Sequence, residues 1–229
     1  MENDFFTPAA VIFDQDGVLY DTERVYHRAW VRAGHEFGIP DPEKLADLCT
    51  GRNIHDIGVI FNEKFGPEFP YSGFMEHRMV YYHEIIRNEG LKLKPGVVEL
   101  LETLQRKHIP ASVCTSTNRE LTESQLHDSG LYRYFADIVD GSMVTNGKPD
   151  PEIYLLAADR LHKDPRDCIG VEDSFNGIRS VFRAGMRPVM VPDLLAPDEE
   201  MKKLAWRIFG TLESLTLWLE RKEGIENVT

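Results

Sequence analysis

The 229-residue sequence predicts an α/β protein, with a mainly parallel sheet covered by helices on both faces and an all-helical insertion after the first strand. Short apolar runs rich in β-forming residues alternate with helical patterns over most of the chain, and this alternation is typical of a parallel sheet. Residues 22–90 break the rhythm, because they contain long helical patterns and no strand-like run. We therefore expect a core domain made of residues 1–20 and 91–229, and a helical domain made of residues 21–90.

Five apolar runs, each bounded by Asp, Gly, Ser or Pro, predict the strands: residues 10–13, 111–114, 136–139, 168–171 and 188–191. Apolar residues at positions i, i+3, i+4 and i+7 predict amphipathic helices between them. One such helix has the apolar face Val97, Leu100, Leu101 and Leu104, and another is expected to begin with Pro151 at its first position. Functional sites of parallel sheets form at the carboxyl ends of strands, so the residues that follow each run are the candidates.

The net charge of −12, from 38 acidic and 26 basic residues, argues against non-specific binding to nucleic acid or to an anionic membrane. Three scattered cysteines favour a reducing compartment over a disulfide framework. The N-terminal residues lack the pattern of a signal peptide, and no apolar run approaches the roughly 18 residues of a membrane helix. We expect a cytoplasmic protein. The sequence does not define the oligomeric state, for which a monomer is the default expectation.

Two carboxylates, Asp14 and Asp16, come directly after the first predicted strand and are followed by Gly17. A carboxylate at a strand end can act as a nucleophile, and one two residues later can act as a general acid/base. Gly17 permits the sharp turn that would bring both side chains to one pocket. The alternative is a pair of solvated aspartates in a loop, which the position between a strand and a glycine disfavours.

A second acidic pair, Glu172 and Asp173, follows the run at 168–171. Acidic residues at a helix N-terminus are the alternative reading, because the helix dipole favours them there. If this strand neighbours the first one, several carboxylates converge and repel one another unless a cation lies among them. Oxygen ligands of this kind favour Mg²⁺.

Two further stretches suggest an anion site. Thr115 and Ser116 in "CTSTNR" follow a strand and precede a helix, where a hydroxyl and backbone N–H groups can bind an anion, although simple helix capping is an alternative. Lys148, between Gly147 and Pro149, is a candidate for a fixed positive charge. Carboxylates, an anion cradle and a lysine in this order indicate phosphoryl transfer through a carboxylate nucleophile.

These stretches resemble the four signature motifs of the haloacid dehalogenase superfamily: "DQDGVLYDTE", "CTSTNR", "GKPDP" and "GVEDSFNGI". The helical insertion resembles the C1-type cap of that family, and the core is then expected to be Rossmann-like. Within the superfamily, "NGKPDPEIYLLAADR" and "RAGMRPVMVPD" look most like phosphatases of sugar phosphates and nucleotide-related monophosphates, with the β-phosphoglucomutases as near relatives.

The resemblance implies a role for each matching residue. Asp14 would attack phosphorus and form an aspartyl phosphate, and Asp16 would protonate the leaving alcohol and later deprotonate water, which requires a pKa above that of free aspartate. Thr115, the Ser116 N–H and Lys148 would bind the phosphoryl oxygens. The Mg²⁺ ligands would be Asp14, the Asp16 carbonyl and Asp173, with Glu172 binding directly or through water. The substrate would be a small phosphorylated metabolite.

Three alternatives differ in their requirements. A dehalogenase needs no acid/base at position 16, because halide leaves without a proton, so Asp16 favours phosphate esters. A hexose phosphate mutase carries an arginine and a histidine in its cap. In this sequence Ile54 and Tyr26 occupy the matching positions, which makes a mutase a weaker prediction than a phosphatase. A catalytically silent ligand-binding protein would require a lost motif residue, and each motif is complete.

The cap of such enzymes closes the active site and selects the substrate. The candidates for substrate contact in the insertion are Glu23, Tyr26, His27, Arg52, Asn53 and His55. Of these, Glu23, Arg52 and Asn53 are predicted to bind the substrate or its phosphate.

Overall fold

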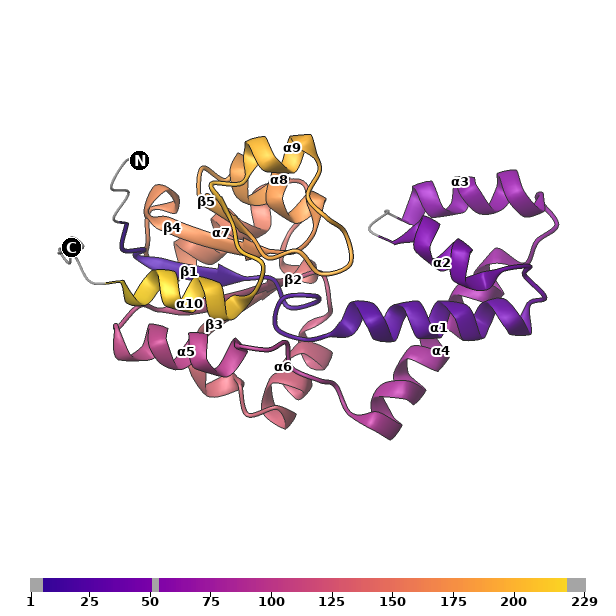
Figure 1. The fold of residues 1–229 in the computed structure, drawn as a ribbon, viewed down its shortest axis with the longest axis horizontal. Helices are drawn as coiled ribbons and strands as arrows, with labels where there is room; N and C mark the ends of the chain where they lie inside the picture. The colour runs from indigo at the N-terminus through magenta and orange to yellow at the C-terminus, as the bar shows by residue number, and fades with distance from the viewer. Residues whose placement is uncertain (1–5, 51–53, 222–229) are drawn as a thin grey trace, which may run out of the picture. The chain divides into compact units, whose positions relative to one another are not determined.

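The computed structural model describes residues 6–50 and 54–221 (Figure 1). The chain forms two compact units, one of Met1–Tyr20 with Leu93–Thr229 and one of Asp21–Lys92. The first unit contains the sheet, and the second is helical.

The sheet has six parallel strands in the order β3-β2-β1-β4-β5-β6. Their bounds are β1 Ala10–Phe13, β2 Ala111–Thr115, β3 Phe135–Asp140, β4 Cys168–Glu172, β5 Arg187–Met190 and β6 Arg207–Ile208. The predicted α/β class with a parallel sheet is confirmed, and all five predicted strands are present within two residues at each end. The sixth strand has only two residues and lies at the sheet edge, so it leaves no alternating or apolar run in the sequence.

Helices cover both faces of this sheet (Figure 1). The helices of this unit are α5 Val97–Arg106, α6 Arg119–Asp128, α7 Glu152–Arg160, α8 Phe175–Arg183, α9 Glu199–Leu204 and α10 Leu212–Glu220, with 3₁₀ turns at Tyr132–Tyr134, Gly141–Met143 and Pro165–Asp167. The predicted apolar face of α5 is buried. Pro151 precedes α7 as its N-cap, one position earlier than predicted. Proline suits either position, because it donates no backbone hydrogen bond.

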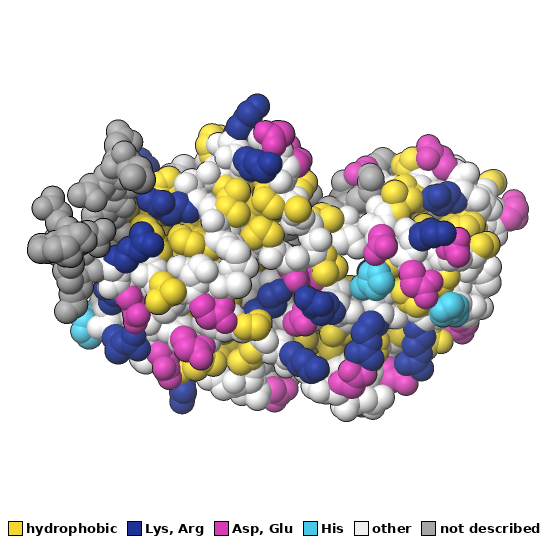
Figure 2. All heavy atoms as spheres, viewed as in Figure 1, with side chains coloured by type: hydrophobic (Ala, Val, Ile, Leu, Met, Phe, Trp, Pro, Cys, Tyr) yellow, Lys and Arg dark blue, Asp and Glu magenta, His cyan; other side chains and the backbone are white. Residues whose placement is uncertain are grey.

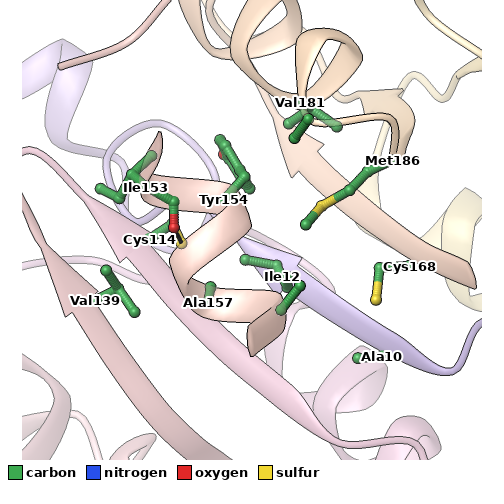
Figure 3. Close-up of a cluster of buried hydrophobic side chains, with 12 residues drawn as sticks. Ala10, Ile12, Cys114, Val139, Ile153, Tyr154, Ala157, Cys168, Val181 and Met186 are labelled. Atoms are coloured by element: carbon green, nitrogen blue, oxygen red, sulfur yellow. Dashed lines mark hydrogen bonds between the residues drawn. The ribbon is translucent and has the colours of Figure 1, made fainter. Parts of the chain in front are cut away.

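The core between the sheet and helices α7 and α8 is apolar and closely packed (Figure 3). Alternate residues of β1, Ala10 and Ile12, point toward Ala157 of α7 and Val181 of α8. Gly170 of β4 lies so close to Val181 that an added Cβ would clash with the valine methyl groups. Such packing holds the strand ends, and therefore the loops that follow them, in fixed positions.

The inserted unit consists of α1 Thr22–Glu36, α2 Pro42–Cys49, α3 Ile54–Phe65 and α4 Tyr71–Glu89. Its core is aromatic: Phe74 contacts the rings of Trp30, Phe37 and Phe61 at centroid distances of 4.9–5.6 Å. Aromatic rings bury a large area per residue, which lets a unit of this size hold its own core. Among the described residues, no helix combines the length and the apolar character that crossing a membrane would require.

Charge is distributed evenly over the visible surface. On the face shown in Figure 2, acidic and basic side chains are interspersed, and many of them form ion pairs. All three cysteines are buried, and none of them forms a disulfide.

Candidate active site

The chain directions of β1 and β4 place two acidic motifs side by side. These strands are neighbours in the sheet, with Phe13 opposite Val171, and they lie where the strand order changes direction. The backbone N–H of Asp14 donates to the carbonyl of Val171 at 2.9 Å. Ligand sites of open α/β sheets form at such a switch point. The two acidic pairs that the sequence singled out therefore flank the expected position of a site.

Three carboxylates meet at these strand ends. One oxygen from each of Asp14, Glu172 and Asp173 lies within 4.8 Å of the others, a spacing that suits a shared metal ion. Asp14 and Glu172 are buried. The carboxylate of Asp16 instead accepts a hydrogen bond from the Thr117 hydroxyl at 2.9 Å. This group accordingly contains the three side chains that were predicted to bind the metal, and the Asp16 side chain, predicted as the acid/base, is oriented by the loop after β2.

Lys148 joins two of the carboxylates. Its Nζ donates to Asp14 Oδ1 at 2.5 Å, to Glu172 Oε1 at 2.7 Å and to the carbonyl of Cys114 at 3.1 Å. Burial lowers the pKa of Lys148, but the adjacent Asp14 and Glu172 carboxylates outweigh it and raise the pKa above its usual value. The lysine is therefore a permanent positive charge, held by all three of its donor positions.

Glu172 is fully buried, and both of its carboxylate oxygens accept hydrogen bonds. Besides Lys148, the Tyr154 hydroxyl donates to Oε1 at 2.7 Å and the Ser174 hydroxyl donates to Oε2 at 3.0 Å. Gly177, in the first turn of α8, packs against this carboxylate, and an added Cβ would overlap it. Tyr154 was not predicted, because only the fold brings it to Glu172, and Ser174 and Gly177 lie within the motif "GVEDSFNGI" but had no predicted role.

Asp14 has an unusual acidity. Its pKa is raised to about 8, mainly by burial, which the Lys148 charge partly offsets and the Glu172 and Asp16 charges reinforce. The site thus holds more negative charge than Lys148 can balance. Hard carboxylate oxygens with excess negative charge are the donor set that a small divalent cation prefers. The residues present fit such a cation.

The loop that carries Asp16 is held at both ends by α6. The Gln15 side-chain amide donates to Oε1 of Gln125, and the Tyr20 hydroxyl donates to the Gln125 carbonyl at 3.0 Å. Inside the loop, Gly17 has φ +76° and packs against the Asp173 carboxylate, so both its conformation and the available space require glycine. Gln125 was not a predicted site residue, since a glutamine within a helix carries no distinctive sequence signal.

The predicted anion cradle lies at the end of β2. Thr115 is the last residue of β2 and is buried, whereas Ser116 is exposed. The Thr115 oxygen accepts a hydrogen bond from the Thr117 N–H at 3.0 Å, which leaves the hydroxyl hydrogen available to an anion. The N-cap of α6 is Asn118, whose side chain accepts from the Leu121 N–H.

The predicted substrate contacts of the insertion are only partly described. Glu23, Tyr26 and His27 lie on α1; Tyr26 stacks on Tyr82 at 4.2 Å, and the His27 ring lies 3.0 Å from the Asp47 carboxylate. Arg52, Asn53 and the side chain of His55 lie outside the described parts of the chain. Their roles stay predictions.

The fold and site define an α/β protein with a cluster of carboxylates at the switch point of a parallel sheet. The chain belongs to the haloacid dehalogenase-like hydrolase family, whose model matches residues 8–185. This confirms the predicted family, and with it an enzyme of the hydrolase class.

Named relatives and solved structures extend the comparison. The phosphorylated carbohydrates phosphatase of Thermotoga maritima is 36% identical over 180 residues, which cover 79% of this chain and 83% of that protein. The beta-phosphoglucomutase of Bacillus subtilis is 31% identical over 192 residues, covering 80% and 82%. A crystal structure of CbbY from Rhodobacter sphaeroides in complex with phosphate aligns with a TM-score of 0.71 and 26% identity, covering 91% and 96%.

Proposed function

We propose that this hydrolase is a Mg²⁺-dependent phosphatase of a small phosphorylated metabolite, a sugar phosphate or a nucleotide-related monophosphate. The observation that carries the proposal is Lys148, whose side chain is only 9% exposed and bridges Asp14 and Glu172 beside Asp173. A fixed ammonium next to a strand-end carboxylate allows that carboxylate to approach a phosphate dianion. The similarity to a phosphatase of phosphorylated carbohydrates supports the substrate class.

The metal would be held by Asp14, Asp173 and the backbone carbonyl of Asp16, and Mg²⁺ suits these oxygen ligands. When bound, the ion would neutralise charge on the phosphate and keep Asp14 ionised. Glu172 already accepts from Lys148, Tyr154 and Ser174, which favours contact with the metal through water over direct ligation.

The reaction would proceed in two steps. The Asp14 carboxylate attacks phosphorus, an aspartyl phosphate forms, and Asp16 gives its proton to the leaving alcohol. Asp16 then takes a proton from water, whose oxygen attacks the phosphorus and restores Asp14. The Thr117 hydroxyl orients the Asp16 carboxylate for both transfers. Lys148, the Thr115 hydroxyl and the Ser116 N–H would bind the phosphoryl oxygens.

The test uses p-nitrophenyl phosphate with Mg²⁺, since any phosphatase of this class should hydrolyse an activated aryl ester. We expect turnover that is lost with EDTA and restored by added Mg²⁺. Asp14→Asn should lower kcat by a factor on the order of 10⁴ or more, because it removes the nucleophile. Asp159→Asn, a change at an exposed position of α7, is the control and should keep full activity. An active Asp14→Asn variant would refute the nucleophile assignment.

A mutase is the second candidate, because the Bacillus subtilis relative is named a beta-phosphoglucomutase. Incubation with β-glucose 1-phosphate and a bisphosphate primer separates the two activities. A phosphatase releases inorganic phosphate, whereas accumulation of glucose 6-phosphate with little free phosphate would establish a mutase.

The cellular setting is part of the same proposal. Three buried cysteines that form no disulfide support a reducing compartment such as the cytoplasm. The monomeric state stays a prediction, which light scattering of the purified protein would test.

A further inference from the structure

The loop that carries Asp16 is cross-linked by its own backbone. The carbonyl of Gln15 accepts hydrogen bonds from the N–H groups of Leu19 at 2.9 Å and Tyr20 at 3.2 Å. The Gly17 N–H donates to the Tyr20 carbonyl at 3.0 Å. These bonds all lie within the loop, so they define its shape and leave its position relative to β1 to other contacts.

Two side chains of the loop supply such contacts, and both reach α6 in the same unit. The Gln15 amide nitrogen donates to Oε1 of Gln125. The Tyr20 hydroxyl donates to the Gln125 carbonyl at 3.0 Å and lies 2.7 Å from Oγ of Ser129, the residue that follows α6. Gln15 and Tyr20 are fully buried, so water does not compete for these hydrogen bonds. A single residue of α6, Gln125, thus holds the loop at both of its ends.

The contact between Gln15 and Gln125 is unfavourable as mere packing. Gln15 lies two residues after the apolar strand β1, and its Oε1 is buried without a hydrogen-bond partner among the described residues. A buried amide with an unpartnered oxygen is less favourable than an apolar side chain of the same size. Buried polar contacts can instead select one arrangement among several that apolar contacts would allow. A requirement for one loop position therefore accounts for the two glutamines better than packing does.

The position of this loop decides where the Asp16 carboxyl lies. A displacement of about 1 Å in a reacting group can lower a rate by about 10²-fold. We infer that Gln15, Gln125 and Tyr20 are positioning residues, which hold Asp16 where it protonates the leaving alcohol. In that step the bond between phosphorus and the alcohol oxygen breaks, and this oxygen takes the Asp16 proton. The role rests on the proposed phosphatase function and adds three residues to its proton transfer.

Two esters that differ only in a nitro group test this role. The p-nitrophenolate group is a weak base and leaves with little help from an acid, whereas the more basic phenolate of phenyl phosphate gains more from proton donation. The quantity to compare is kcat/KM, because it ends at the release of the leaving group and excludes the later hydrolysis of the aspartyl phosphate. Gln125→Met should raise the ratio of kcat/KM for p-nitrophenyl phosphate to that for phenyl phosphate by about tenfold.

Three further variants give the result its meaning. Asp16→Asn removes the acid itself and should raise the ratio further than Gln125→Met does. Tyr20→Phe removes one hydroxyl of the network, while Ser129 keeps its contact with the Gln125 carbonyl, and it should raise the ratio by about threefold. Gln105→Met makes the same change at an exposed position of α5 and should leave the ratio unchanged.

An unchanged ratio in Gln125→Met, or an equal fall of kcat/KM on both esters, would overturn the positioning role. If that variant does not fold, Tyr20→Phe takes its place with the same two outcomes. A ratio that Asp16→Asn leaves unchanged, or a wild-type chain that hydrolyses neither ester, would instead overturn the proposed function.

Discussion

Lys148 and Arg78 are both cations that the fold has removed from water, and their surroundings differ. In the sheet-containing unit, Lys148 donates to two carboxylates and one carbonyl. In the helical unit, Arg78 has ring faces and a sulfur atom around it, and no ion pair to a described carboxylate. Lys148 has an acceptor for each of its three donor positions, whereas the buried Nε of Arg78 has none.

The two environments have different consequences for activity and for stability. A group that acts on every substrate must already be in its working position, because each reorganisation during the reaction raises the barrier. A desolvated cation without an ion pair lowers stability instead, because the hydration that it loses is not replaced. We therefore expect substitution of Lys148 to lower both activity and stability, and substitution of Arg78 to leave stability unchanged or to raise it.

The largest effect is expected for Lys148→Met. This change leaves Asp14 and Glu172 buried without their counter-charge, which should lower the free energy of unfolding by about 3 kcal/mol or more. It should also lower kcat by a factor on the order of 10²–10³ on every phosphate ester, including p-nitrophenyl phosphate. Urea unfolding and initial rates measure the two quantities. Lys107→Met, at an exposed position of the same unit, is the control; equal behaviour of the two variants would show that the bridge has no special role.

A smaller effect is expected for Gly177→Ala, which sharpens the comparison by disturbing the surroundings of Lys148 and leaving the lysine in place. The added methyl would overlap the Glu172 carboxylate, so Glu172 must move away from its bonds to Lys148 and Tyr154. We expect a loss of about 1–3 kcal/mol in stability and a fall in kcat of tenfold or more. Gly210→Ala, where an added Cβ meets no atom within 4 Å, should change neither value. A fully active Gly177→Ala variant would contradict the tight seating of Glu172.

The smallest effect is expected for the stability of Arg78→Met. Replacing an unpaired, desolvated cation by an apolar side chain of similar length should leave the free energy of unfolding unchanged or raise it by up to about 1 kcal/mol. Thermal unfolding of the variant beside the wild type measures the change. A destabilisation as large as that of Lys148→Met would mean that Arg78 already has its full set of partners in the folded protein.

Much of this fold could be predicted from the sequence, because the strands that form the sheet centre are short apolar runs with clear boundaries. Asp14, Lys148, Glu172 and Asp173 could be predicted as a group, since parallel strands bring their carboxyl ends to one edge. Whether a residue follows the end of a strand can be read from the local sequence. All parallel strands of a sheet run in one direction, so residues that follow their carboxyl ends lie at the same edge.

The residues that surround the site could not be predicted in this way. Tyr154 and Gln125 lie on the inner faces of helices, where Tyr154 donates to the Glu172 carboxylate and the Gln125 carbonyl accepts from Tyr20. The amphipathic pattern of a helix shows which residues are buried, but it does not show which polar groups they contact. Arg78 is a similar case, because its desolvation depends on what three neighbouring helices place around it. Whether a buried polar side chain has a hydrogen-bond or ion-pair partner depends on tertiary contacts, which the local sequence does not show.

The path of the chain into and out of the helical unit has a consequence for the history of this enzyme. Tyr20 and Leu93 pair as neighbouring antiparallel residues, and the Asp21 N–H donates to the Lys92 carbonyl at 2.9 Å. The 72 residues between Tyr20 and Leu93 therefore begin and end at one point, so the sheet needs only that short junction to stay intact. A different helical module could be grafted at the same junction, and a lineage could acquire new substrates there while the reacting groups stay unchanged.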